Sequence, residues 1–227
     1  MLSLSCQYGL GLTVALITSR VNPKIKLIRS LHDRKHRDRT RLFLVEGWRL
    51  VREAVERGGS IDALIYAHEL CSSEEWRLIR RHRGELIAAT PQVLSAIASG
   101  HQRPAVVAVG RQSWQTLDQL PVTQDSMWLA LTDISHPGSL GTVLRTCDAA
   151  GADGVMLLGD CADPYDPSCV NASHGAAFSQ SLVRTSFPEL AVWAAQRRCA
   201  LVGTSPAGRS DLRDVTHRRP LVIVMGG

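Results

Sequence analysis

Residues 133–151 read DISHPGSLGTVLRTCDAAG, and they follow the apolar run WLALT at 128–132. The apolar run has the length and composition of a buried strand. The Pro137-Gly138 pair after it is typical of a turn, and the residues that follow favour a helix. A strand that passes through a tight turn into a helix presents backbone N–H groups at the mouth of a parallel sheet, where they can bind an anion. This stretch predicts an α/β fold with a ligand site at the carboxyl edge of its sheet.

Arg145 is the only residue with a fixed charge between Ile134 and Thr146. Two interpretations are open on the residues alone. The guanidinium either binds an anionic ligand, or it forms a structural ion pair with Asp148 or Asp153. The same stretch offers Asp133 and Ser135 as caps for the helix, because short polar side chains accept hydrogen bonds from the first N–H groups of a helix.

Three segments of the second half resemble conserved motifs of one enzyme family and occur in the family's order. Residues 133–151 are similar to motif 1 of the SpoU/TrmH family of RNA 2′-O-ribose methyltransferases, a family of the SPOUT class. The segment ADPYDPSCVNASHGA at 162–176 resembles the family's second conserved loop and helix, and PLVIVMGG at 220–227 resembles the strand that opens motif 2. The resemblance implies S-adenosylmethionine as the cofactor and a ribose 2′-OH of RNA as the methyl acceptor.

The resemblance also implies roles for single residues of this chain. Arg145 occupies the catalytic position of motif 1, and we interpret it as an orienting and stabilising group because a guanidinium is normally protonated. Gly226 matches the motif 2 glycine that contacts the cofactor, and Thr204 and Ser205 end an earlier strand that lines the same pocket. Ser139 stands where the family usually has an asparagine, and we expect it to contact RNA.

The first half resembles the accessory RNA substrate-binding domain of that family, which has an L30e-like fold. The matching words are ITSR at 17–20, NPK at 22–24, LHDRK at 31–35, FLVEG at 43–47 and HQRPAVVAV at 101–109. The alternation of strand-like and helix-like segments is that of a small α/β domain. We expect an L30e-like domain at 17–111, a linker at 112–124, and a parallel-sheet SPOUT methyltransferase domain of the trefoil-knot type at 125–227.

Positive charge is concentrated between residues 20 and 41. This stretch holds nine Lys or Arg residues and two Asp residues, whereas the whole chain has a net charge of +5. Such a cluster can neutralise phosphates and bind nucleic acid, although charge runs are more often solvated helix faces. The residues expected to bind RNA are Arg20, Lys24, Arg34, Lys35, Arg37 and Arg39. By resemblance, ribosomal RNA is the expected partner ahead of transfer RNA.

The family's third motif would follow Gly227, so the resemblance implies that the knot region is missing and that the methyltransferase domain is incomplete at its C-terminus. Asn171 also departs from the family, which commonly has an arginine there. We interpret the sequence as a methyltransferase or a fragment of one, and the alternative is a non-catalytic RNA-binding relic. The resemblance implies a homodimer for a complete member, through an interface that uses the helix missing here, so the expectation is not extended to this form.

Composition sets the remaining expectations. The six cysteines form no C-x-x-C pair and no histidine lies at zinc spacing, so we expect no metal site and a reducing, cytoplasmic compartment. Nothing in the sequence predicts a membrane span. Residues 1–16 precede the family pattern and are interpreted as an extension rather than as a signal peptide.

Periodicity and turn residues predict the local elements that carry these motifs. Strands are expected at 61–66, 154–158 and 221–225. Helices are expected at 73–83 with Ser73 as the cap, at 141–150, and at 167–178 with Asp166 or Ser168 as the cap.

Overall fold

The computed structural model describes residues 5–6, 14–99, 104–208, 210–211 and 214–226. Its chain divides into two compact units. Unit 1 comprises Met1–Gln112 and Tyr165–Asn171, and unit 2 comprises Ser113–Pro164 and Ala172–Gly227. No helix in the described part of the chain is both long and apolar enough to cross a bilayer.

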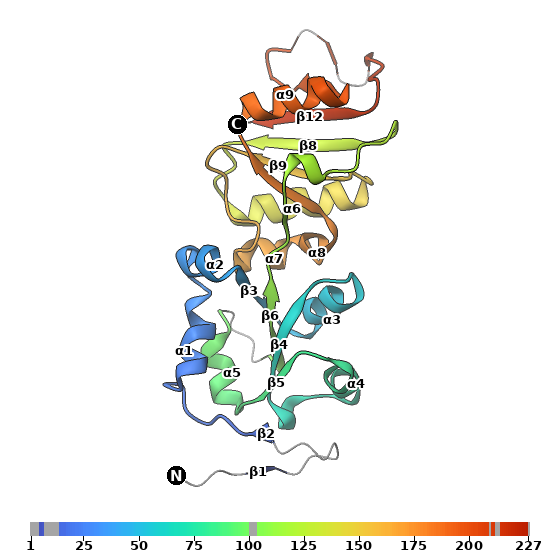
Figure 1. The fold of residues 1–227 in the computed structure, drawn as a ribbon. Helices are drawn as coiled ribbons and strands as arrows, with labels where there is room; N and C mark the ends of the chain where they lie inside the picture. Colours follow the sequence, from blue (N-terminus) through green and yellow to red (C-terminus); the bar gives the residue numbers. More distant parts are fainter. Residues whose placement is uncertain (1–4, 7–13, 100–103, 209, 212–213, 227) are drawn as a thin grey trace. The chain divides into compact units, whose positions relative to one another are not determined.

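Unit 1 is a mixed four-stranded sheet with helices on both faces (Figure 1). The strand order is β3 (Leu42–Glu46), β6 (Val106–Arg111), β4 (Ile61–Tyr66), β5 (Glu85–Ala88). Only β4 and β5 are parallel. Helices α1 (Pro23–Ser30) and α5 (Pro91–Ile97) lie on one face, and α3 (Trp48–Glu56) and α4 (Ser73–Arg81) lie on the other. Helix α2 (Arg34–Thr40) leads into β3.

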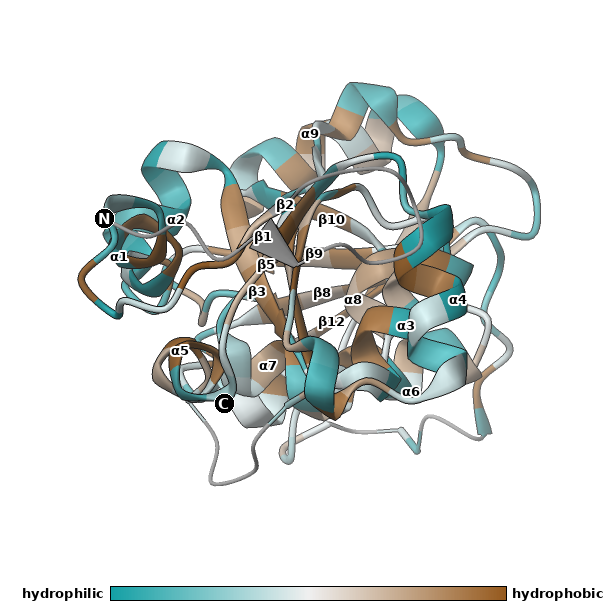
Figure 2. Ribbon diagram, turned by 90° about the horizontal axis from the view of Figure 1, so that it is seen from below, coloured by the Kyte–Doolittle hydropathy of each residue, from teal (hydrophilic) through white to brown (hydrophobic). Residues whose placement is uncertain are grey.

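The core of unit 1 explains why these segments form the expected elements. Ile25 and Ile28 of α1 and Leu94 of α5 pack against Leu44 and Ile65 of the sheet, and all five side chains are buried. In Figure 2 the apolar residues are concentrated on strands and inner helix faces, while the outer helix faces are hydrophilic. Removal of these apolar side chains from water is the main driving force for this packing. The expected strand at 61–66 is confirmed.

Two short strands precede the first helix. Strand β1 (Ser5–Cys6) pairs antiparallel with β2 (Val14–Ala15). Most of the segment that we interpreted as an extension, and residues 101–103 of the expected closing strand, lie outside the described residues.

Unit 2 is a six-stranded sheet in which every adjacent pair is parallel. The order is β11 (Ala200–Gly203), β12 (Leu221–Gly226), β8 (Met127–Thr132), β9 (Gly154–Leu158), β10 (Ser181–Thr185), β7 (Trp114–Gln115). Helix α9 (Phe187–Arg197) covers one face, and α6 (Pro137–Ala149) and α8 (Ala176–Ser179) lie on the other (Figure 1). Because the strands are parallel, all their carboxyl ends meet at one edge.

The sheet of unit 2 is sealed by large side chains on the α9 face. Trp128 of β8, Met156 of β9 and Val222 of β12 pack with Leu190 and Trp193 of α9, and all are nearly inaccessible to solvent. The expected strand at 154–158 is confirmed, and the strand expected at 221–225 extends to Gly226. The fold class is confirmed as α/β with a parallel-sheet second unit. The expectation about the knot concerns residues after Gly227 and stays a prediction.

The segment expected to be a linker, 112–124, contributes structure to unit 2. Trp114 and Gln115 form the edge strand β7 beside β10, and Leu117–Gln119 form a 3₁₀ helix. Leu120 is buried in the core. The boundary between the units falls between Gln112 and Ser113. The polar composition of residues 112–124 did not predict this contribution to unit 2, because a two-residue edge strand is too short to show a periodic pattern.

Three helix boundaries also differ from expectation. Helix α4 is capped by Ser72, not Ser73, in a capping box with Glu75. The single helix expected at 167–178 is two helices, α7 (Pro167–Ser173) and α8, because His174 and Gly175 both have positive φ, at 49° and 100°. Helix α6 starts at Pro137, four residues earlier than expected, because proline is favoured in the first turn of a helix.

Candidate active site and RNA-binding surface

The turn between β8 and α6 leaves the start of the helix uncapped by side chains. Asp133 follows β8 with a φ of 58°, and the residue at the N-cap position is His136, which forms no side-chain cap. The expected caps Asp133 and Ser135 are therefore wrong. The chain turns at Asp133 instead, and the first N–H groups of α6 are left without a side-chain acceptor. The N-terminus of a helix carries a partial positive charge, which suits an anionic group.

Arg145 lies on the exposed face of α6. Ser139, Thr142 and Thr146 are exposed on the same helix, at the spacing of one helical face. The hydroxyl groups of both threonines donate to carbonyl oxygens one turn earlier, Thr142 to Gly138 at 3.1 Å and Thr146 to Thr142 at 3.0 Å. This face therefore presents one fixed charge, the guanidinium of Arg145.

The acidic groups that could have neutralised Arg145 have other partners. The carboxylate of Asp148 accepts hydrogen bonds from Ser179 at 2.9 Å and Gln180 at 3.4 Å. The carboxylate of Asp153 accepts from the backbone N–H of Met127 at 2.7 Å. Within the described part of the chain, Arg145 forms no ion pair or hydrogen bond. The structural ion-pair interpretation is therefore wrong, and the guanidinium is available to a ligand.

The carboxyl edge of β8, β11 and β12 brings together the predicted cofactor-binding residues. Gly226 of β12 is paired in register with Thr132 of β8, and a Cβ atom at Gly226 would lie 2.1 Å from the Thr132 hydroxyl oxygen. A side chain at position 226 would require the Thr132 hydroxyl or the strand to move. Just after β11, the backbone N–H of Thr204 donates to the carbonyl of Val224 at 2.9 Å. Thr204 is thereby fixed beside β12 although its side chain is exposed.

Ser205 continues the same edge. It is exposed, and its hydroxyl oxygen accepts a hydrogen bond from the backbone N–H of Ala207 at 3.2 Å. This edge is suited to a ligand that is held through backbone groups. It has no side chain at Gly226, and Thr204 and Ser205 beside it are exposed. The residues present therefore fit the cofactor that the motifs imply.

The acidic residues of the loop after β9 form an ion pair and a helix cap. The buried carboxylate of Asp163 lies 3.8 Å from the guanidinium of Arg184, which stacks 4.1 Å from the ring centre of Trp114. The carboxylate of Asp166 accepts from the backbone N–H of Ser168 at 2.9 Å, which confirms Asp166 as the cap of α7. These contacts give the acidic residues structural roles.

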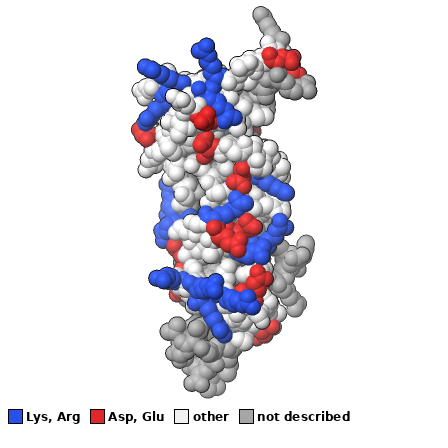
Figure 3. Space-filling view, turned by 90° about the vertical axis from the view of Figure 1, so that its right-hand side faces the viewer, with Lys and Arg blue, Asp and Glu red and all other residues white. Residues whose placement is uncertain are grey.

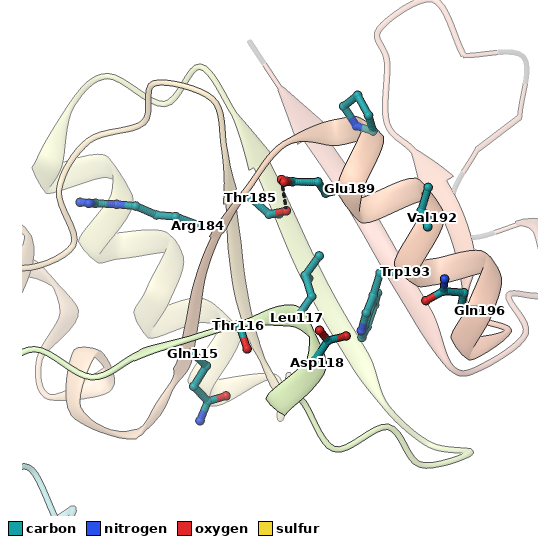
Figure 4. Close-up of a pocket in the computed structure, with 11 residues that line it drawn as sticks. Gln115, Thr116, Leu117, Asp118, Arg184, Thr185, Glu189, Val192, Trp193 and Gln196 are labelled. Atoms are coloured by element: carbon teal, nitrogen blue, oxygen red, sulfur yellow. Dashed lines mark hydrogen bonds between the residues drawn. The ribbon is translucent and has the colours of Figure 1, made fainter.

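A cavity of about 580 Å³ in unit 2 lies elsewhere, between β7, β10 and α9 (Figure 4). Leu117, Val192 and Trp193 provide its apolar surface, and Thr185 donates to Glu189 at 3.0 Å across its rim. The backbone N–H and hydroxyl of Ser186 also donate to Glu189 and hold the pKa of that carboxyl below its usual value. Glu189 therefore completes the cap of α9, and the cavity contains none of the predicted site residues.

The basic stretch of unit 1 divides into exposed and buried residues. Lys24 pairs with Glu85, and the guanidinium of Arg34 lies 3.7 Å from Asp38. The exposed residues Arg20, Lys35 and Arg39 have no ion pair within the described residues. The positive charges of these three side chains are therefore available to bind RNA phosphates.

Arg37 is not available to RNA, so the prediction that it binds RNA is wrong. Its side chain is 1% exposed. Its guanidinium donates to the carbonyls of Leu31 at 2.9 Å and His32 at 2.8 Å, and pairs with Asp166 at 3.1 Å. The charge pattern could not distinguish it from its neighbours, because burial of one residue in a seven-residue helix depends on what packs against it.

The buried position of Arg37 predicts a stability effect. Arg37→Ala is expected to lower the free energy of unfolding by about 2–4 kcal/mol, because it leaves two buried carbonyls and one carboxylate without their donor. Arg39→Ala, on the exposed side of the same helix, is the matched control and should change stability by at most about 0.5 kcal/mol. Urea denaturation measures both. Equal midpoints for the two variants would show that the buried guanidinium contributes no net stability.

Comparison with known proteins agrees with the division into units. Residues 22–108 match the MRM3-like substrate binding domain, and residues 126–227 match the SpoU rRNA Methylase family. A 23S rRNA (uridine(2479)-2′-O)-methyltransferase of Streptomyces viridochromogenes is 35% identical over 204 residues, which cover 86% of this chain and 71% of that protein. A 23S rRNA (guanosine(2553)-2′-O)-methyltransferase of Bacillus subtilis is 24% identical, over 92% of this chain and 81% of the relative.

Solved structures give the same result. The crystal structure of an rRNA methyltransferase from Sinorhizobium meliloti superposes with a TM-score of 0.84 at 32% identity, over 94% of this chain and 82% of that one. The SpoU methyltransferase AviRb from Streptomyces viridochromogenes in complex with AdoMet also has a TM-score of 0.84, at 33% identity, over 90% of this chain and 81% of that one. The match of residues 126–227 and the 35% identity to a 23S rRNA 2′-O-methyltransferase show that this chain belongs to the SpoU rRNA methylase family.

Proposed function

We propose that this protein transfers the methyl group of S-adenosylmethionine to a ribose 2′-OH of ribosomal RNA. The observation that carries the proposal is Arg145, an exposed arginine on α6 without a partner among the described residues, at the position that the SpoU motif assigns to catalysis. Curated relatives that methylate 23S rRNA at 2′-O support ribosomal RNA as the substrate. The alternative of a non-catalytic relic is not favoured, because the motif arginine and the motif glycine are both in place.

The chemistry requires that a weakly acidic hydroxyl oxygen gain negative charge as its proton leaves. S-adenosylmethionine, when bound, supplies a methyl group on a positively charged sulfur. Arg145 contributes a fixed cation that can bind the RNA phosphate and stabilise the developing charge on the oxygen. A guanidinium does this without losing its own proton, so another group or water accepts the proton from the hydroxyl.

The cofactor is proposed to be held at the carboxyl edge of unit 2. Gly226 allows backbone approach there, and Thr204 and Ser205 offer exposed hydroxyl groups on the neighbouring loop. Ser139, exposed in the first turn of α6, is proposed to contact the RNA near the reacting nucleotide. Parallel α/β sheets bind ligands at this edge, which supports the placement.

The partners and compartment are also proposals. The exposed basic residues Arg20, Lys35 and Arg39 are proposed to bind RNA phosphates, with the paired residues Lys24 and Arg34 contributing less. The cytoplasm is proposed because five described cysteines are free thiols, which a reducing compartment maintains. A homodimer is proposed for the complete enzyme, on family resemblance alone.

The binding steps can be tested on the wild-type protein. Calorimetry should detect binding of S-adenosylmethionine by the protein. Absence of binding would contradict the proposal.

The exposed basic residues predict a salt-dependent RNA affinity. Filter binding of ribosomal RNA over a salt series gives the slope of the logarithm of the binding constant against the logarithm of the salt concentration. This slope should be smaller in magnitude by about 1 in Arg39→Gln than in wild type, because each lost phosphate contact means that about one counterion fewer is released on binding. Lys24→Gln is the control, since that lysine is already paired with Glu85. A wild-type slope near zero would contradict phosphate binding, and equal slopes in both variants would remove Arg39 from the contact surface.

A further inference from the structure

A groove in unit 1 lies between α3 and α4, on the face of the sheet opposite α1 and α5. Its volume is about 430 Å³. Figure 3 shows the side of the molecule on which α3 and α4 lie, where Lys and Arg side chains gather around a smaller group of acidic ones. Residues at the spacing of one helical face line each wall, including Trp48, Arg52 and Val55 from α3 and Arg77 and Arg81 from α4.

The carboxylates of Glu56 and Glu74, which line the groove, both form ion pairs with Arg52. The guanidinium of Arg52 lies 3.9 Å from Glu56 on its own helix and 3.4 Å from Glu74 on α4. This arrangement ties the two walls together. Both carboxylates that line the groove thus pair with Arg52.

Three arginines carry the remaining positive charge of the groove. Arg77, Arg81 and Arg83 line the groove, are exposed, and have no ion pair among the residues that the structure describes. Arg77 and Arg81 are four residues apart on α4, so their Cβ atoms are roughly 5–6 Å apart. His82 adds no charge at neutral pH, because burial lowers the pKa of its imidazole.

The floor of the groove is apolar. Val55 is 40% exposed, and Trp48 and Leu78 are half-buried beside it. Proteins bind single-stranded RNA with surfaces of this kind, in which guanidinium groups flank an aromatic or apolar floor. The unstacked bases of the RNA cover apolar or aromatic surface, and its phosphates pair with arginine. A helical duplex keeps its bases stacked inside and has nothing to place on this floor.

We propose that the α3–α4 groove binds a single-stranded segment of the RNA substrate, with Arg77, Arg81 and Arg83 on its phosphates and a base against Trp48 and Val55. The inference rests on the proposed RNA substrate, and it adds a contact surface separate from the basic stretch at residues 20–41. Charge complementarity argues for this occupant. An acidic protein segment would meet the same arginines but would not need the half-buried aromatic ring of Trp48.

The test compares two double variants of the full chain. Arg77→Gln/Arg81→Gln removes two charges from the groove. Arg57→Gln/Arg80→Gln removes two charges from the end of α3 and from α4, and neither arginine lines the groove. Arg57 pairs with Glu53 at 3.0 Å, and Arg80 lies over the ring of Trp76. Fluorescence anisotropy over a salt series measures binding of an end-labelled single-stranded RNA of mixed sequence, its duplex, and polyglutamate.

The groove variant should lose affinity for the single strand, with a salt slope lower in magnitude by about 1.4, which is the value for two phosphate contacts on a single strand. Duplex binding should change little, and the control variant should resemble wild type. Equal behaviour of the two variants overturns the proposal while wild-type RNA binding leaves the proposed function intact. Wild type that binds no RNA contradicts both, and loss of polyglutamate binding alone would identify an acidic protein as the occupant.

Discussion

Replacement of Arg145 by alanine is expected to lower kcat by about 10²–10³-fold while the affinity for S-adenosylmethionine stays at the wild-type value. The guanidinium is exposed on α6 and has no partner within the described residues, so its charge is free to act on the RNA. Its effect is largest when the hydroxyl oxygen gains charge, and loss of such an interaction appears in kcat. Methyl transfer to ribosomal RNA and calorimetric titration of the cofactor measure the two quantities.

Two further variants sharpen this test. Arg145→Lys keeps the charge but not the planar fork of donors, so it should restore only part of the rate. Thr142→Ala changes the same exposed face and removes a hydroxyl that is already bonded to Gly138 at 3.1 Å, so it should transfer methyl groups at close to the wild-type rate. Full activity in Arg145→Ala would exclude Arg145 as the catalytic residue.

Replacement of Gly226 by alanine is expected to abolish measurable cofactor binding. The added Cβ would lie 2.1 Å from the Thr132 hydroxyl oxygen, so the Thr132 side chain or the end of β12 must move. Overpacking of this kind costs about 1–3 kcal/mol of stability. Movement of β12 also displaces the backbone that the cofactor is proposed to contact. Thermal unfolding and calorimetry report the two effects separately.

Gly203 provides the matched control for Gly226. It ends the neighbouring strand β11, and a Cβ there would meet no atom within 4 Å. Gly203→Ala should therefore leave stability and cofactor binding near wild type. In Thr132→Ala/Gly226→Ala the clash with the hydroxyl is removed, so stability and cofactor binding should both return toward wild type. Restored stability without cofactor binding would mean that the added Cβ itself obstructs the cofactor.

The sequence predicted the elements whose signal is local. The apolar run before Asp133 predicted β8 and the residues after it predicted α6, because both signals lie in neighbouring residues of the chain. The Pro137-Gly138 pair, expected as a turn, is instead the start of α6. The catalytic position followed from resemblance, and the structure added that Asp148 and Asp153 have other partners. That information is three-dimensional, so both interpretations of Arg145 were open from the sequence.

The failures have a common physical cause, which is dependence on distant residues. Arg37 has the same charge as Arg39, yet it is buried, and one of its partners is Asp166, more than a hundred positions away in the chain. The edge strand at Trp114 forms only because β10 offers an unpaired side. The segment WRLIRRHR at 76–83 holds four arginines. This density of charge could have predicted a second basic surface besides residues 20–41.

The most direct test of the central claim is methyl transfer itself. Unmodified ribosomal RNA is incubated with the protein and with S-adenosylmethionine carrying a radiolabelled methyl group, and the RNA is then digested with alkali. Alkaline cleavage needs a free 2′-OH, so a 2′-O-methylated nucleotide stays joined to its neighbour. We predict label in alkali-resistant dinucleotides, lost in Arg145→Ala. Label in mononucleotides only would place the methyl group on a base and contradict the assignment.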